Sequence, residues 1–290
     1  MGRLKCRKDM PMKRLLTVLV ILVALALPPQ ALADVDARTV RTVRLPEPAR
    51  QVSISPQGRN YFVLGDKTLY LYTIEGQLLG SAEVGTDVAS IAAQSDNLVL
   101  MTRKGQGRIE YFLVDPVQRI DIGDAPVRGA VDAPVTLVVF DDFQCPYCAQ
   151  MAPVLKQVLD NNPKTVRLAL KNFPLQMHRY ARKAAIAALA AGRQGKYWAM
   201  HDLLFANYRQ LSDQKVDELA QKLNLDMARW KKDLEDPVLA AQVDADLRQG
   251  QKLGVRGTPT LYVNGRLVRD RSPQGLQQLI NAELRRLQRK

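Results

Sequence analysis

The pattern of apolar and polar positions changes character near residue 124. Before this point the apolar residues form short runs, mostly β-branched, aromatic or aliphatic, and turn residues separate them. Short runs bounded by Gly, Pro, Asn, Asp and Ser are typical of β-strands. These strand-like runs cover residues 52–54, 61–64, 69–72 and 78–84. We therefore predict a small all-β domain over residues 34–123.

This β-rich segment contains an internal repeat with an offset of 37 to 40 residues. Ser53-Ile54 matches Ser90-Ile91, and Val84-Gly85 matches Ile122-Gly123. The spacing, with four strands expected per unit, is similar to that of propeller blades. Two blades cannot close a propeller. They can pack face to face, rest against a neighbouring domain, or present edge strands to another chain.

Beyond a Pro- and Gly-containing linker at 124–130, the pattern becomes that of an α/β domain over residues 131–290. Residues 135–140 are apolar except for Thr136, which is typical of a buried central strand. A second strand is predicted at 165–170, and helical spacing follows at 180–191, 197–205, 212–223, 226–234, 237–253 and 273–287. Ser212, Asp226 and Ser272 are the predicted N-caps.

The N-terminus has the organisation of a targeting segment. Six basic residues precede an uncharged run at 15–27, and Ala31-Leu32-Ala33 supplies a cleavage pattern of small residues. The run of 13 residues is shorter than the roughly 20 that a spanning helix needs. We predict a signal peptide at 1–33, with an uncleaved membrane anchor as the alternative. Export to the periplasm follows, a compartment in which disulfides persist.

Removal of residues 1–33 lowers the net charge from +13 to +8 and leaves two cysteines, Cys145 and Cys148. The remaining basic excess lies after residue 123, without an interleaved aromatic pattern or a nucleic-acid motif. We therefore expect no nucleic-acid partner. Three cysteines and two histidines in the whole chain also leave little material for a metal site.

The two remaining cysteines form the motif Cys145-Pro146-Tyr147-Cys148, between a predicted strand and a predicted helix. A helix N-terminus stabilises a thiolate at Cys145, and Pro146 is favoured at the first helical position. Cys148, three residues later, lies on the buried side of the first turn. Cys145 is therefore the candidate nucleophile and Cys148 the resolving thiol. Half of a zinc site and a purely structural disulfide are the alternatives. No cofactor beyond the redox-active disulfide is expected.

A second motif, Gly257-Thr258-Pro259-Thr260, precedes an apolar run that ends in Asn264-Gly265. Asn-Gly between two short apolar runs predicts a tight hairpin. Pro259 at the head of a strand is tolerated at an edge or as a cis peptide in a tight turn.

With these two motifs, residues 131–290 resemble the thioredoxin superfamily, and in particular its exported DsbA-like and DsbG-like branch. The resemblance implies a thioredoxin-like domain with a helical insertion. It also implies that Pro259 is cis and packs beside the two cysteines. Thr258 would then offer its backbone to an extended client segment. Pro146 and Tyr147 complete the active-site motif.

One position departs from this family. Many relatives carry a buried acid six residues before the first cysteine, and this position is Val139 here. Asp142 is the nearest substitute as proton acceptor for the resolving thiol, and Asp141 is the next. The alternative for Asp142 is a solvated loop carboxylate.

These features predict a periplasmic thiol-disulfide oxidoreductase that exchanges disulfides with exported, cysteine-containing client proteins and is recycled by a membrane redox partner. The first alternative is a disulfide isomerase or reductase that is kept reduced and forms a homodimer through residues 34–123. The second is a Cu(I)-binding chaperone in which the dithiol holds the metal.

Overall fold

The computed structural model describes residues 36–289, so the predicted signal peptide at 1–33 lies outside the described residues. Residues 47–290 form one compact unit, and it contains all the elements described below. Within the described part of the chain, no helix combines the length and the apolar character needed to cross a bilayer.

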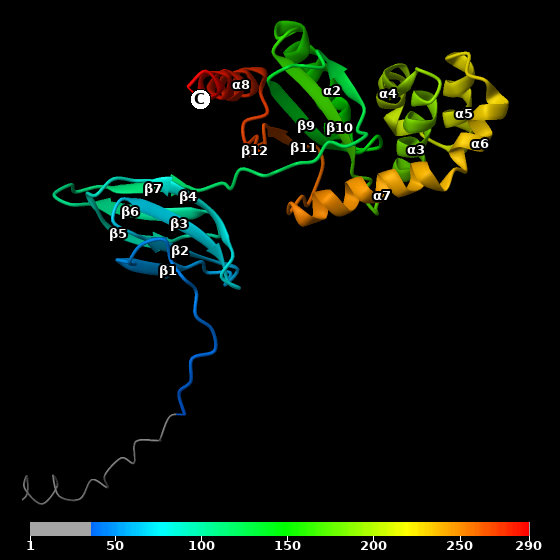
Figure 1. Cartoon of the computed structure of the whole chain (residues 1–290). Coiled ribbons are helices and arrows are strands. Elements are labelled where there is room, and N and C mark those ends of the chain that lie inside the picture. Colours follow the sequence, from blue (N-terminus) through cyan, green and yellow to red (C-terminus); the bar gives the residue numbers. More distant parts are fainter. Residues whose placement is uncertain (1–35, 290) are drawn as a thin grey trace, which may run out of the picture. The chain divides into compact units, whose positions relative to one another are not determined.

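The β-rich region consists of two antiparallel sheets (Figure 1). The first sheet has the order β1-β2-β3-β4, with β1 at Gln51–Ile54, β2 at Asn60–Leu64, β3 at Thr68–Thr73 and β4 at Leu78–Glu83. The second has the order β5-β6-β7, with β5 at Val88–Ala93, β6 at Leu98–Arg103 and β7 at Ile109–Leu113. The expectation of four strands in the second unit is wrong, because residues 114–123 form no strand. The propeller-like relationship stays a prediction.

The two sheets enclose one apolar core, to which Phe62, Leu71, Ile91 and Met101 contribute. Side chains of β1 bind the backbone of β5: Gln51 bonds both the N–H and the C=O of Ile91, at 2.9 and 2.7 Å. Ser53 Oγ accepts from the Ala93 N–H at 2.9 Å. Both pairs are 40 residues apart, which equals the longest offset of the sequence repeat.

The third sheet belongs to the α/β region and has the strand order β12-β11-β9-β10-β8. Its strands are β8 at Val127–Gly129, β9 at Val135–Asp141, β10 at Val166–Asn172, β11 at Thr260–Val263 and β12 at Arg266–Leu267. β9 and β10 are parallel, and the other pairs are antiparallel. The linker prediction at 124–130 is wrong for β8, which pairs with β10. Gly129 permits this pairing, since a Cβ there would lie 2.8 Å from the Val166 carbonyl oxygen.

The helices lie close to their predicted positions. They are α2 at Pro146–Asn161, α3 at Ala181–Gly192, α4 at Tyr197–Ala206, α5 at Asp213–Lys222, α6 at Met227–Leu234, α7 at Pro237–Lys252 and α8 at Pro273–Leu287, with a 3₁₀ turn, η1, at Tyr208–Gln210. The three predicted N-caps are confirmed, because the side chains of Ser212, Asp226 and Ser272 accept backbone N–H groups of their helices. Helices α3 to α7 form the insertion between β10 and β11 (Figure 1).

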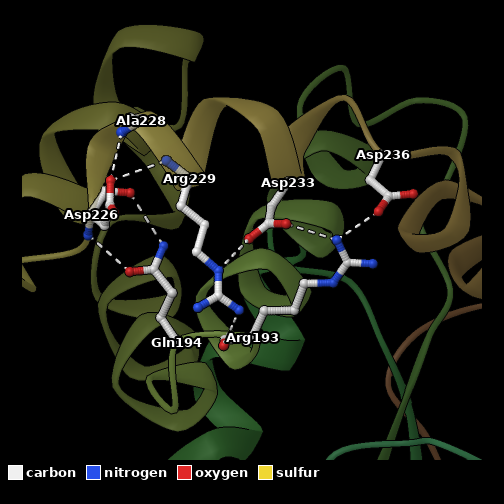
Figure 2. A network of polar contacts seen from close by, with 7 residues as sticks. All are labelled: Arg193, Gln194, Asp226, Ala228, Arg229, Asp233 and Asp236. Carbon is white, nitrogen blue, oxygen red and sulfur yellow. Dashed lines mark hydrogen bonds and ion pairs between the residues drawn. The ribbon is translucent and has the colours of Figure 1, made fainter.

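A polar network joins α3 to α6 within this insertion (Figure 2). Arg193 Nη1 bridges the carboxylates of Asp233 and Asp236 at 2.7 and 2.6 Å. Gln194 bonds the N–H of Asp226 at 2.8 Å and its C=O at 3.3 Å. Because Asp226 also caps α6, these contacts hold the C-terminal end of α3 against the N-terminal end of α6.

Strand β9 sends alternate side chains to opposite faces of its sheet, as a strand must. Val135, Leu137 and Val139 enter the large core shared with α2 and the insertion. Val138 and Phe140 enter a smaller core on the other face, together with Phe173 and Tyr262. Residue 141 therefore faces the same side as Val139, which is the side of α2.

Candidate active site

Cys145 is the N-cap of α2, with extended backbone angles of φ −75° and ψ 121°, and Pro146 follows in the first turn. The Cys145 N–H donates to the Asp142 carbonyl at 3.1 Å, which closes the turn after β9. Both cysteines are free thiols. Cys145 is 3% exposed and Cys148 is 0% exposed, while the neighbouring Tyr147 is 68% exposed. Both cysteines are therefore buried, and Cys148 is fully enclosed.

The second motif lies directly beside the first. The peptide bond between Thr258 and Pro259 is cis, as the resemblance implied. β11 pairs with β9 so that Thr260 lies opposite Phe140, and this register carries Thr258 to the end of β9. The Cys145 thiol donates to the Thr258 carbonyl oxygen, with an Sγ–O distance of 3.4 Å. Residues 113 positions apart in sequence thus share one site.

Asp141 lies below the dithiol, at the last position of β9 and on the face that meets α2. Burial raises the pKa of Asp141 to about 6, and a contact with the Cys148 thiol partly opposes this rise. Burial also raises the pKa of Cys148 well above its ordinary value, and the neighbouring charge of Asp141 adds to the effect. The two groups form a buried acid–thiol pair: the Asp141 carboxylate disfavours ionisation of Cys148, whereas the hydrogen bond from the Cys148 thiol favours the ionised form of Asp141.

Asp142 occupies a different environment from the one expected. Its side chain is 0% exposed, so the alternative of a solvated loop carboxylate is wrong. Its oxygens accept from the N–H groups of Gln144 and Leu175 at 2.7 and 2.8 Å, and from His178 Nδ1 at 2.8 Å. These contacts fasten the loop before Cys145 to the segment before α3. The acid beside Cys148 is Asp141, so the preference for Asp142 as its proton acceptor is corrected.

The alternation of side chains along β9 could have identified Asp141 from the sequence. Ranking the acids by their distance in sequence from Cys145 favoured Asp142 instead. Side chains of a strand face the same side at every second residue. Asp141 lies two residues after Val139, so it shares the face of the position where relatives carry their acid. In this chain the acid on that face is therefore two residues closer to Cys145 than in those relatives.

A buried ion pair supports the strands below the site. Lys171 Nζ lies 2.6 Å from Asp246 Oδ1, and these side chains are 9% and 3% exposed. The other oxygen of Asp246 accepts from the backbone N–H and the side-chain amide of Asn172, both at 3.0 Å. Asn172 is the register partner of Asp141. Helix α7 is thereby tied to the strand that adjoins the acid of the site.

A dithiol at a helix N-terminus, a cis proline beside it and this strand order together define a thiol-disulfide oxidoreductase of the thioredoxin fold. Residues 122–282 match the model of the family described as thioredoxin (Thioredoxin_4). The chain belongs to this family, and it is a thiol-disulfide oxidoreductase of the thioredoxin superfamily.

Among solved structures, a thioredoxin-like oxidoreductase from Silicibacter pomeroyi is 33% identical, with a TM-score of 0.50, over 56% of this chain and 92% of that one. ScsC from Proteus mirabilis, at 24% identity and a TM-score of 0.50, covers 56% of this chain and 73% of its own, and shares the fold. A curated relative, the Na(+)/H(+) antiporter NhaA 1 of Salinispora arenicola, is 34% identical over 67% of this chain. The match spans 31% of that relative's length, and its name describes that longer protein.

Proposed function

We propose that this protein exchanges disulfides with exported client proteins in the periplasm, through Cys145 as the exchanging sulfur and Cys148 as the resolving one. The observation that carries the proposal is the placement of the pair, with Cys145 at the N-cap of α2 against the Thr258 carbonyl and Cys148 enclosed against Asp141. Only Cys145 is placed to meet a sulfur from outside.

In the oxidising direction, a client thiolate attacks Cys145 Sγ of the enzyme disulfide, and the S–S bond to Cys148 breaks. Cys148 leaves as a thiolate and takes a proton from Asp141. A second client thiolate then attacks the client sulfur of the mixed disulfide, and Cys145 is released as a thiolate. The client gains a disulfide and the enzyme holds the dithiol.

In the reducing direction, the Cys145 thiolate attacks a client disulfide and forms the mixed disulfide. Cys148 then gives its proton to the Asp141 carboxylate and attacks Cys145 Sγ, which releases the reduced client. A thiol as strongly buried as Cys148 needs an acceptor within the protein, and Asp141 is the acid in contact with it. Asp141 therefore serves both directions.

The client contact is proposed for the backbone of Thr258. Its carbonyl oxygen lies 3.4 Å from Cys145 Sγ, so an extended segment that places its cysteine at Cys145 passes alongside residue 258. Main-chain pairing of this kind gives affinity that depends little on the client's sequence. Tyr147, which lies between the two cysteines in sequence, is 68% exposed, and its ring is proposed to border the same approach.

Two variants test these roles. Cys145→Ser is expected to abolish exchange with a reduced, unfolded cysteine-containing protein, since no reachable sulfur remains. Cys148→Ser is expected to accumulate the mixed disulfide with a disulfide-containing client, because the Cys145 thiolate attacks the client disulfide, displaces one client thiolate and is then not resolved; gel mobility under non-reducing conditions detects this species. Retained exchange in Cys145→Ser would overturn the assignment.

The direction of exchange is tested by the reduction potential of the Cys145–Cys148 pair and its redox state in cells. We propose an oxidant recycled by a membrane redox partner, so the pair is expected to be mostly oxidised in cells. A pair that is mostly reduced, with a potential well below that of its compartment, would favour the isomerase or reductase alternative.

A further inference from the structure

Strand β7 is an edge strand that lacks the neighbour its counterpart has. Within the described residues β7 pairs with β6 alone, whereas the corresponding β3 pairs with both β2 and β4. The sequence repeat places residues 116–121 at the position of β4. This segment runs elsewhere: the Gln118 N–H donates to the Gly265 carbonyl oxygen at 2.8 Å. A Cβ on Gly265 would lie 2.0 Å from the Gln118 carbonyl oxygen, so the approach is close.

The free edge of β7 has a defined set of backbone groups. The Val114 N–H donates to the Asn97 carbonyl at 2.8 Å, so this pair is of the hydrogen-bonded type. Hydrogen-bonded and non-hydrogen-bonded pairs alternate along an antiparallel ladder. Given the register of β6 and β7, the N–H and C=O groups of Ile109, Tyr111 and Leu113 therefore point away from β6.

The side chains of these three residues are also the apolar groups that β7 exposes. Ile109 is 59% exposed, Tyr111 is 72% exposed and Leu113 is 43% exposed. Leu98 and Leu100 of β6 continue this partly exposed apolar face. Protein edge strands are normally protected by Lys, Pro, a bulge or a covering segment. β7 contains no Lys or Pro, its one charged side chain, Glu110, is partly buried and bound by Arg103 and Arg108, and its pairing with β6 is regular.

The other margins of the two sheets in the β-rich region are less open. β4 carries the charged Glu83, and the register of its pairing with β3 shifts between Leu71 and Tyr72. β1 and β5 face each other and are bridged by the side chains of Gln51 and Ser53. β7 is therefore the margin best suited to accept another strand.

We propose that two copies of this chain associate through β7, as an antiparallel pair centred on Tyr111. In this register Ile109 lies opposite the partner's Leu113, and Tyr111 lies opposite the partner's Tyr111. Each of these residues directs its free backbone groups to the edge, so both hydrogen bonds of each pair can form. Apolar and aromatic cross-strand pairs of this kind stabilise a sheet.

The occupant is a second copy because the strand is complementary to itself about its own centre, which a client of arbitrary sequence is not. The charges agree with this choice. Glu110 lies opposite the partner's Phe112 in this register, and its carboxylate is already bound by Arg103 and Arg108 at 2.9 and 3.0 Å. No unpaired charge is placed against the partner's apolar side chain. A two-fold axis through Tyr111 gives the closed symmetry typical of homodimers.

A matched pair of substitutions tests the interface, since Ile109 and Ile54 are the same residue type and each is 59% exposed. Ile109→Lys is expected to weaken dimerisation of the mature chain about tenfold or more, measured by sedimentation equilibrium. Ile54→Lys, on β1, is expected to leave it unchanged. A wild-type chain that stays monomeric at all concentrations would overturn the proposal, as would equal effects of the two substitutions.

A cysteine trap tests the register. Hydrogen-bonded partners of an antiparallel pair have Cα atoms about 5.5 Å apart, within the range of a disulfide. In a chain that also carries Cys145→Ser and Cys148→Ser, oxidised Tyr111→Cys is expected to give a covalent dimer. Ile54→Cys in the same background is expected to remain monomeric. Equal cross-linking at both positions, or binding of an extended peptide to β7 by a monomeric protein, would contradict the proposal. These outcomes do not depend on disulfide exchange, because the cross-linking chain lacks Cys145 and Cys148. Exchange activity is measured separately, on the chain that retains both cysteines.

Discussion

The two folded regions treat polar and apolar side chains in opposite ways. Among the described residues, the β-rich region before residue 124 buries one polar side chain, that of Ser55. The thioredoxin-like region buries nine polar or charged ones, namely Asp141, Asp142, Asn162, Lys171, Asn172, His201, Asp233, Asp246 and Glu283. Exposed large apolar side chains are instead concentrated in the β-rich region: Val52, Ile54, Ile74, Leu78, Ile109, Tyr111, Leu113 and Val117.

This difference matches the separate roles that we propose for the two regions, catalysis in one and association in the other. A buried charge is costly and persists only where partners compensate it or where function needs it. An exposed apolar residue costs little, but a row of them on an unprotected edge favours association. The buried polar groups of the thioredoxin-like region include those that contact the Cys145–Cys148 pair. The exposed apolar residues of the β-rich region include those on the edge of β7.

The largest effect on stability is expected at the buried ion pair. Asp246→Ala leaves Lys171 buried without its partner and removes the acceptor of the Asn172 N–H. We expect a loss of about 3–5 kcal/mol in the free energy of unfolding, measured by urea denaturation of the reduced protein. The control is Asp160→Ala, which breaks the exposed pair with Lys156 and is expected to cost less than about 1 kcal/mol. Equal losses would show that burial does not distinguish the two pairs.

The next effect is expected at Asp141, with a defined dependence on pH. Its pKa is about 6 in the folded reduced protein, above the ordinary value, so folding favours the protonated form. Stability is therefore expected to fall as the pH rises from about 4 to about 6, and to remain lowered above this range. Asp141→Asn removes this fall and is expected to be more stable than the wild type at pH 8, by up to about 3 kcal/mol.

The same substitution is expected to slow the resolving step. Cys148 attack should accelerate with a midpoint near pH 6 in the wild type, as Asp141 becomes an available base. Asp141→Asn is expected to lose this midpoint, in stopped-flow measurements of mixed-disulfide resolution. An unchanged pH profile would remove Asp141 from the mechanism.

A smaller effect is expected at Asp142. Asp142→Asn keeps one acceptor oxygen but weakens the shared contacts with the Leu175 N–H and His178. We expect a loss of about 1–2 kcal/mol in the free energy of unfolding. The midpoint of the resolving step is expected to stay near pH 6, which separates a loop-fastening acid from the proton acceptor. A loss of that midpoint would contradict this division of roles.

The smallest effect is expected on the exposed face of the β-rich region. Ile54→Ala changes a side chain that is 59% exposed and is expected to alter stability by less than about 0.5 kcal/mol. Ile91→Ala, on the core side of β5 and 3% exposed, is expected to cost about 2–4 kcal/mol. Thermal unfolding of the two variants makes the comparison, and similar losses would mean that Ile54 packs against another part of the protein.

Much of the local structure followed from short-range patterns. The helix starts at Ser212, Asp226 and Ser272 were predictable because a capping side chain acts on N–H groups two or three residues away. The Asn264-Gly265 hairpin was predictable because both residues adopt the positive φ that such a turn requires. Strand β8 was missed because a three-residue strand has too little periodicity, and its pairing with β10 depends on a partner far along the chain.

The sequence by itself determined the dithiol motif, the strand and helix around it, and the separation of a β-rich region from an α/β region. These depend on spacing between neighbours, which the order of residues specifies directly. Only the tertiary structure decided that Asp141 rather than Asp142 lies against Cys148 and that Thr258 reaches Cys145. It also decided that β7, among residues 36–289, lacks the second neighbour that β3 has. Each of these depends on strand register and on which face of a sheet meets a helix. Such contacts join residues that are distant in sequence, so spacing between neighbouring residues does not specify them.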